Sequence, residues 1–161
     1  MTKLSTNSQS TEPLSLATIG WREWVCFPQL NDAKLIAKTD TGARSSALHV
    51  EQLDYAVDEA GLHWVKFVLP VEFYPHQPEL ASSARQFCLP LKDQRTIKNS
   101  AGQQQHRSVV ELTVIMGCER FDIEVTLTCR KLMKYPMLLG RTALKNRFIV
   151  NVAGSFYLGH A

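Results

Sequence analysis

The segment Asp40-Thr41-Gly42 places a carboxylate where it could take part in proton transfer. It follows Lys34–Thr39, a mainly apolar run typical of a short strand, and Asp and Gly favour a sharp turn at the end of a strand. About a hundred residues later, a second apolar run, Met137–Leu139, ends in Gly140-Arg141. The sequence has one Asp in this setting, so a site built from two carboxylates would need a second copy of the chain.

Two carboxylates close together share one proton, because like charges at that distance cannot both ionise. The ionised member can deprotonate a bound water, while the protonated member donates to the carbonyl oxygen under attack. Asp40 from each of two subunits would supply this pair. The alternative is that Asp40-Thr41-Gly42 is a structural turn only, since these residue types are common in turns.

The surrounding sequence predicts an all-β domain with one short helix. Period-two alternation and β-branched residues favour strands at Ser108–Met116 and Arg120–Cys129, joined by a turn at Gly117-Cys118-Glu119. Further strands are predicted at Ile19–Phe27, Lys34–Thr39, Ser46–Asp54, Leu53–Val57, Leu62–Leu69, Met137–Leu139, Phe148–Val152 and Ser155–Leu158, with a polar hairpin at Arg95–His106 and an irregular loop at 70–84. Thr142 is predicted to cap a helix over Ala143–Arg147.

The composition is typical of one soluble globular domain, with 161 residues, 45% of them hydrophobic and 20% charged. No apolar run is long enough to span a bilayer, and the Ser/Thr-rich start of the chain lacks the apolar core of a secretory signal. We therefore expect a disordered leader at 1–17, one domain at 18–161 and a cytoplasmic location. The four cysteines show no Cys-x-x-Cys spacing and are predicted to be buried free thiols.

Charge is distributed unevenly along the chain. Residues 1–84 contain 6 Lys/Arg and 10 Asp/Glu, whereas residues 85–161 contain 12 Lys/Arg and 5 Asp/Glu. A basic half can attract acidic partners, although ordinary solvated faces give the same count. The sequence has no Lys/Arg run of the kind found in nucleic-acid-binding tails, so neither a nucleic acid nor a membrane is expected as a partner.

A resemblance to a known family adds to these local signals. Thr39–Ala43 resembles the catalytic loop of the retropepsins, the retroviral-type aspartic peptidases, and His106–Leu144 resembles the second half of such a chain. Lys38–His49 and Pro136–Arg141 are similar to a bacterial family of retropepsin-like peptidases, once named as ATP-dependent zinc proteases and associated with ATP-grasp ligases that add glutamates to a ribosomal protein. The resemblance covers Ile19–Gly159 and implies a closed acid-protease barrel that works as a homodimer on peptides.

The resemblance also implies roles for the residues around the turn. Asp40, Thr41 and Gly42 would form the catalytic loop, in which Thr41 bonds across the subunit boundary and the Gly42 N–H donates to the carboxylate. Gly140 would allow close packing under this loop, and Arg141 would anchor it.

The polar hairpin Arg95–His106, with its turn at Asn99–Gly102, would be the flap that covers substrate and excludes water. It is long and polar, and it has one glycine where retroviral flaps have several. The hairpin and the catalytic loop together give these predicted substrate-binding residues: Ala43, Arg44, Lys98, Asn99, Ser100, Gly102 and Arg107.

Arg44 departs from the family pattern. Retropepsins often carry an acidic residue at this position, two after the motif Gly, and it pairs with the Arg of the Gly-Arg element. We hypothesise that Arg44, helped by Lys98 or Arg107, recognises acidic peptides such as glutamate-rich tails, because a guanidinium matches the geometry of carboxylates. The alternative is that Arg44 pairs with Asp54 or Glu72.

Two other functions remain open beside the homodimeric aspartic endopeptidase. The first is a non-catalytic peptide-binding or regulatory module on the same fold, and the second is a zinc metalloprotease. The five histidines are dispersed, with no His-Glu-x-x-His segment and no Gly-rich phosphate loop, so no metal and no cofactor are expected. For the homodimer, the apolar segments Phe148–Val150 and Phe156–Leu158 are candidate interface strands.

Overall fold

The computed structural model describes residues 15–98, 101–129 and 134–159. The strands are β1 (Ala17–Gly20), β2 (Arg22–Phe27), β3 (Ala33–Thr39), β4 (Ser46–His49), β5 (Gln52–Val57), β6 (His63–Val68), β7 (Gln86–Pro90), β8 (Asp93–Lys98), β9 (Gln104–Met116), β10 (Glu119–Thr128), β11 (Met137–Leu139) and β12 (Phe148–Asn151). The helical elements are α1 (Arg141–Leu144) and three 3₁₀ turns at Pro28–Leu30, Val71–Phe73 and Ser82–Arg85.

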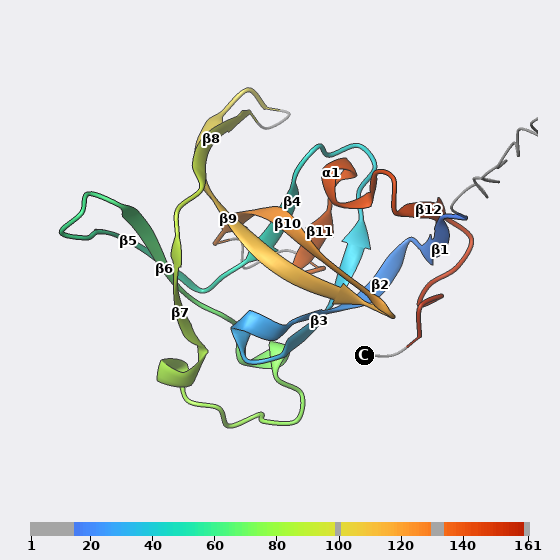
Figure 1. The fold of residues 1–161 in the computed structure, drawn as a ribbon, viewed down its shortest axis with the longest axis horizontal. Helices are drawn as coiled ribbons and strands as arrows, with labels where there is room; N and C mark the ends of the chain where they lie inside the picture. Colours follow the sequence, from blue (N-terminus) through green and yellow to red (C-terminus); the bar gives the residue numbers. More distant parts are fainter. Residues whose placement is uncertain (1–14, 99–100, 130–133, 160–161) are drawn as a thin grey trace, which may run out of the picture.

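Six of the strands close into a barrel in the order β10, β4, β11, β3, β2 and β9, and β9 pairs back onto β10 (Figure 1). β8 extends the sheet beyond β9 as an antiparallel hairpin that projects from the barrel. β1 and β12 form a parallel pair, and β5, β6 and β7 form a separate antiparallel sheet. The predicted closed all-β barrel with one short helix is confirmed.

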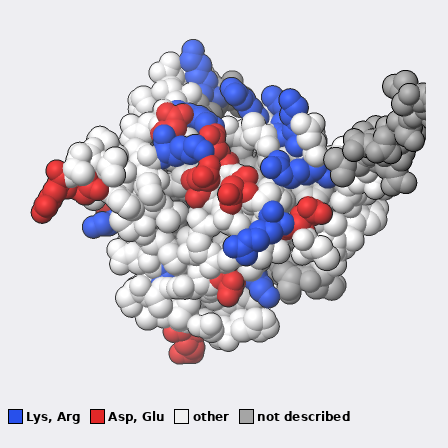
Figure 2. Space-filling model, viewed as in Figure 1, with Lys and Arg blue, Asp and Glu red and all other residues white. Residues whose placement is uncertain are grey.

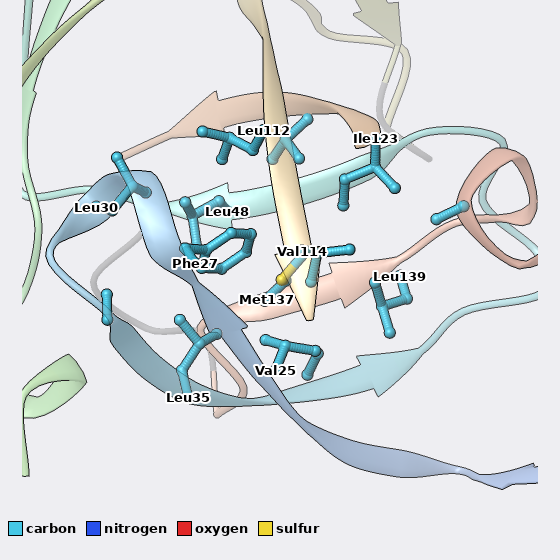
Figure 3. Packing of buried hydrophobic residues seen from close by; sticks show 14 of the residues in the cluster. Val25, Phe27, Leu30, Leu35, Leu48, Leu112, Val114, Ile123, Met137 and Leu139 are labelled. Carbon is cyan, nitrogen blue, oxygen red and sulfur yellow. The ribbon is translucent and has the colours of Figure 1, made fainter. Parts of the chain in front are cut away.

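The interior of the barrel is filled by side chains that alternate inward along each strand. Figure 3 shows Val25 and Phe27 from β2, Leu48 from β4, and Leu112 from β9 converging on one another. These side chains are at most 1% exposed, so the strands that carry the residues around Asp40 are held by a close-packed core.

Two predicted strands prove to be divided. Ile19–Phe27 is interrupted at Trp21, where the chain leaves β1 and its partner β12 and enters β2, which pairs with β3. Ser46–Asp54 is likewise split between β4 in the barrel and β5 in the separate sheet. Local residue preferences favour strand throughout both segments, and the change of hydrogen-bonding partner ends each strand.

Four further expectations need correction. β7 was not predicted, and Ser155–Leu158 is not a strand. The helix begins at Arg141 after Gly140, so Thr142 lies inside it and does not cap it. All four cysteines are free, but none is buried, since Cys26 is half-buried and the other three are exposed. Most of the leader predicted at 1–17 lies outside the described residues, although Ala17 begins β1.

Charged side chains are unevenly distributed on the face shown in Figure 2. Lys and Arg gather along the side where the β8–β9 hairpin and α1 project, whereas the tip of the β5–β6 hairpin carries Asp58 and Glu59 (Figures 1 and 2). Within the part of the chain that the structure describes, no helix combines the length and apolarity needed to cross a bilayer.

Candidate active site

The turn that carries Asp40 is shaped by the strand order β4, β11, β3. Residues 40–45, called here the Asp40 turn, connect β3 to β4, and β11 lies between these two strands. The connection therefore crosses the end of β11, where Gly140 lies. A Cβ on Gly140 would come within 2.5 Å of the Ser45 carbonyl carbon, so glycine is the residue that permits this crossing. The close packing predicted at Gly140 is present.

The carboxylate of Asp40 is held by backbone donors. Its Oδ1 accepts hydrogen bonds from the N–H groups of Gly42 and Ala43, each at 3.1 Å. The N–H of Asp40 itself donates to the carbonyl of Leu139 at 2.8 Å, which fixes the residue to the end of β11. Among the described residues Oδ2 has no hydrogen-bond partner. One oxygen is therefore oriented by the turn, and the other remains for a water or a second carboxyl group.

Arg141 holds the Asp40 turn through the backbone carbonyls of the turn. One nitrogen of its guanidinium donates to the carbonyls of Thr41 (3.1 Å) and Gly42 (2.9 Å). The N–H of Arg141 also donates to the carbonyl of Ala43 at 2.9 Å. Backbone carbonyls thus take the place of the acidic side chain that pairs with this arginine in the family pattern, and the anchoring predicted for Arg141 is observed.

Arg44 is exposed, and its guanidinium forms no ion pair or hydrogen bond with another described residue. The alternative pairing with Asp54 or Glu72 is therefore absent from this part of the chain. The carbonyl of Arg44 accepts from the N–H and the hydroxyl of Thr142, both at 3.0 Å, so its backbone is fixed while its charge faces solvent.

The other residues predicted to bind substrate lie on the β8–β9 hairpin. Lys98 is exposed near its end, and Gly102 has a φ of +78°, which favours glycine in the turn. Arg107 is half-buried and donates to Oε1 of Gln105 at 3.2 and 3.3 Å, so its guanidinium is partly engaged within its own strand. Asn99 and Ser100 lie outside the described residues.

A pocket of about 330 Å³ opens beside Thr41. Its lining is mainly apolar, with two cations, and consists of Thr41, Arg141, Leu144, Lys145, Phe148 and Val150. Ile149, between two of these residues, is 55% exposed, and Val152 is 80% exposed. An open, mainly apolar pocket beside the Asp40 turn is the kind of surface on which another protein chain packs.

A family model described as "Retropepsin-like aspartic endopeptidase RimB" matches residues 18–159. The chain belongs to this RimB-like family. Its match extends from β1 to the segment that follows β12, so the barrel, the Asp40 turn and the β8–β9 hairpin are all parts of the family domain.

Relatives of this RimB-like chain are named "Probable alpha-L-glutamate ligase". The protein from Shewanella pealeana is 36% identical over 88% of this chain, and that from Desulfotalea psychrophila is 33% identical over 92%. These matches span 30% and 31% of the relatives, so the chain corresponds to less than a third of their length. A crystal structure of a Legionella pneumophila protein of unknown function is 28% identical, covers 89% of this chain and 99% of its own, and has a TM-score of 0.67.

Sequence reasoning missed several residues that position the Asp40 turn in this RimB-like domain. The carbonyl of Trp21 accepts from both the N–H and the hydroxyl of Thr39, at 2.9 and 3.0 Å, which fixes the residue before Asp40. The hydroxyl of Ser46 accepts from the N–H of Gly140 at 3.1 Å. No local pattern marks either contact, because each joins segments that are distant in the sequence.

Glu23 was also missed, although the sequence contains a signal for it. It is fully buried, and its carboxylate accepts from the N–H groups of Gly20 (2.6 Å), Tyr157 (2.8 Å) and Leu158 (3.3 Å). Glu23 shares the inward parity of Val25 and Phe27 along β2, so the alternation itself points to a buried acid.

The described residues contain no group of three or more His, Cys, Asp or Glu placed to hold a metal ion.

Proposed function

We propose that two copies of this chain form an aspartic endopeptidase in which their Asp40 carboxyl groups activate a water against a peptide bond. The observation that carries the proposal is the geometry of the Asp40 turn, in which Oδ1 is fixed by two N–H donors and Oδ2 is unpartnered among the described residues. Catalytic groups gain most from such preorganisation, because their orientation then costs nothing during the reaction.

In the proposed reaction the ionised Asp40 takes a proton from the water, whose oxygen attacks the peptide carbonyl carbon. The protonated Asp40 of the second copy donates its proton to the carbonyl oxygen, which gives a tetrahedral intermediate. The C–N bond then breaks as the amine nitrogen receives a proton from the first carboxyl group, while the second carboxylate takes back a proton from a hydroxyl of the intermediate, which becomes the carboxylic acid product. The N–H donors of Gly42 and Ala43 keep one oxygen of each carboxylate in place through these steps.

The surface beside Thr41 supports the proposal that a second copy of the chain binds there. The pocket lined by Thr41, Phe148 and Val150 adjoins the Asp40 turn and is mainly apolar. A twofold interface at this place would bring two Thr41 residues and two Asp40 carboxyl groups toward one axis, as a shared site requires.

We further propose that the substrate is an acidic peptide. Arg44 presents an exposed charge in the Asp40 turn with no ion-pair partner among the described residues, and Lys98 adds a second exposed cation on the hairpin. The relatives named alpha-L-glutamate ligase suggest chains of glutamate as the substrate class. Guanidinium groups bind carboxylates in a planar, two-pronged geometry, so a row of glutamates would suit this side of the site.

The test is cleavage of acidic and neutral peptides, read by mass spectrometry, for the wild type and Asp40→Asn, each with and without chelator. The proposal predicts cleavage that favours acidic peptides, is absent in Asp40→Asn and is unaffected by chelator. Acidic-peptide binding without cleavage by the wild type would replace the peptidase with a peptide-binding module. Chelator-sensitive cleavage that survives Asp40→Asn would point to a metalloprotease.

A mixing experiment tests the shared site directly. If each site needs Asp40 from both copies, an equal mixture of wild type and Asp40→Asn that has exchanged subunits should keep about a quarter of the activity of the same total amount of wild type. Activity that falls only to about a half would show that one copy suffices.

A further inference from the structure

We infer that Arg95 is a positioning residue that fixes the base of the β8–β9 hairpin to the Asp40 turn, so that the hairpin stands over the turn in one defined placement. This inference rests on the proposed function for its effect on catalysis, but the contact itself belongs to the folded chain. Arg95 lies on β8, in register with Arg107 of β9, two residues beyond Val109, where the pairing of β9 with β10 ends.

The guanidinium of Arg95 contacts its own strand and two other segments, the Asp40 turn and β10. One nitrogen donates to the hydroxyl of Ser45 at 3.0 Å, and Nε donates to Oδ2 of Asp93 at 3.1 Å. The remaining nitrogen forms an ion pair with Oε2 of Glu124 on β10. The planar fork of arginine can make these contacts at once, which a lysine in its place could not do.

Ser45 links the base of the hairpin to the Asp40 turn, because it belongs to the turn and accepts the hydrogen bond from Arg95. Its backbone is the part that a Cβ on Gly140 would strike, and the preceding residue, Arg44, is tied through its carbonyl to Thr142. The Asp40 turn is therefore fixed to β11 and α1 on one side and, through Ser45, to Arg95 on the other.

The surrounding charges explain why Arg95 holds this position. Glu124 lies directly opposite Glu111 in the β9–β10 register, and like charges at such a pair repel. Lys92 forms ion pairs with both glutamates, and Arg95 pairs with the second oxygen of Glu124. The ion pair holds the pKa of Glu124 below its ordinary value, mainly through the hydrogen bond from Arg95, so both groups are charged at neutral pH.

Arg95 and Arg44 are therefore distinct although both adjoin the Asp40 turn. The charge of Arg95 is matched by Glu124 and Asp93, and its side chain is 32% exposed. Arg44 is exposed and has no ion pair with a described residue. Arg95 is consequently assigned to holding the site together, and Arg44 is left to meet the substrate.

Hydrogen exchange tests the inference without any need for catalysis. In Arg95→Gln we expect amide exchange to rise together in residues 40–46 and in the β8–β9 hairpin, by about tenfold, since hydrogen bonds from a charged donor are lost. The barrel strands β2 and β3 should exchange as in the wild type. The matched control is Lys92→Gln, which removes a cation from the same ion-pair group but does not touch Ser45.

A double-mutant cycle with Ser45→Ala identifies the contact responsible. In the Ser45→Ala background, Arg95→Gln should add less than about twofold to the exchange of residues 40–46, because the two residues act through one hydrogen bond. For peptide cleavage we expect Arg95→Gln to raise KM roughly tenfold and to change kcat less, with Lys92→Gln near the wild type and Arg95→Lys in between.

The outcomes separate the two proposals. Unchanged exchange in Arg95→Gln, or the same change in Lys92→Gln, would overturn the role of Arg95 whatever the chain catalyses. If exchange rises at both segments in Arg95→Gln while the wild type cleaves no peptide, the contact is supported and the peptidase is rejected. Additive effects of Arg95→Gln and Ser45→Ala would show that the hairpin and the Asp40 turn are not coupled through this bond.

Discussion

The Asp40 turn and the β8–β9 hairpin are stabilised by different kinds of interaction. The turn is held by two N–H donors on the Asp40 carboxylate, by the guanidinium of Arg141 on two carbonyls, and by the close packing of Gly140 against the Ser45 backbone. The hairpin extends beyond the closed barrel with exposed side chains and meets the turn through the side chain of Arg95.

The difference matches the demands on the two regions. In the proposed peptidase, proton transfer between carboxyl groups would tolerate little displacement, so the turn that carries Asp40 would need several contacts that hold it in one geometry. In the proposed peptidase the hairpin would have to admit and release a peptide, and side-chain contacts open at a lower free-energy cost than a sheet ladder. Three substitutions can break or sharpen this contrast.

The largest effect is expected at Gly140, where the Asp40 turn crosses the end of β11. Gly140→Ala should lower the free energy of unfolding by about 2 kcal/mol, because its Cβ would overlap the Ser45 backbone, which cannot move away freely. Denaturant unfolding measures the change. The matched control is Gly42→Ala, whose Cβ would meet Asp40 Oδ1 at 3.3 Å and should cost much less. Equal losses would show that the crossing at Gly140 is not the tight point of the turn.

An intermediate effect is expected at Arg44, the exposed cation of the Asp40 turn. Arg44→Glu should reduce the preference for acidic over neutral peptides roughly tenfold in kcat/KM, and the reduction should shrink at high salt because the charges are exposed. Lys66→Glu on β6 makes the same charge change in the other sheet and should leave the preference intact. An unaltered preference in Arg44→Glu would remove Arg44 from substrate recognition.

The smallest effect is expected from the ion pair at the hairpin base. The pKa of Glu124 is lowered by Arg95 and, less strongly, by Lys92, so folding favours its ionised form. Its contribution to stability is therefore present above the ordinary pKa of 4.5 and is lost as the pH falls through the lower folded value. Asp93 and Glu111 also face this group of charges.

Glu124→Gln should accordingly lower Tm by about 2 °C at neutral pH and by less below pH 4.5, the modest size following from partial exposure to water. Thermal melts from pH 7 to pH 3 measure this, with Glu119→Gln on the same strand as the control. A difference that persists unchanged at pH 3 would mean that packing, and not the charge of Glu124, is responsible.

Much of the site could be predicted because its signals are local. Asp40-Thr41-Gly42 follows a strand, and Gly140-Arg141 follows another, so their turn geometry is written in neighbouring residues. The long strands β9 and β10 show period-two alternation over part of their length. The strand predicted at Arg120–Cys129 lies within one residue of the bounds of β10, whereas β9 begins at Gln104, four residues before the predicted start at Ser108. The helix was misplaced by two residues at its start because Gly140, and not Thr142, precedes it.

The sequence by itself determined that a carboxylate stands on a turn after a strand, that a Gly-Arg pair accompanies it, and that one such motif occurs per chain. The tertiary structure decided which segments meet there. The carbonyl of Trp21 accepts from the N–H of Thr39, the chain at Ser45 crosses over Gly140, and Arg95 contacts Ser45. The physical reason is that turn and strand preferences act between neighbours, whereas these contacts depend on strand order and register. Those are set only when the barrel closes.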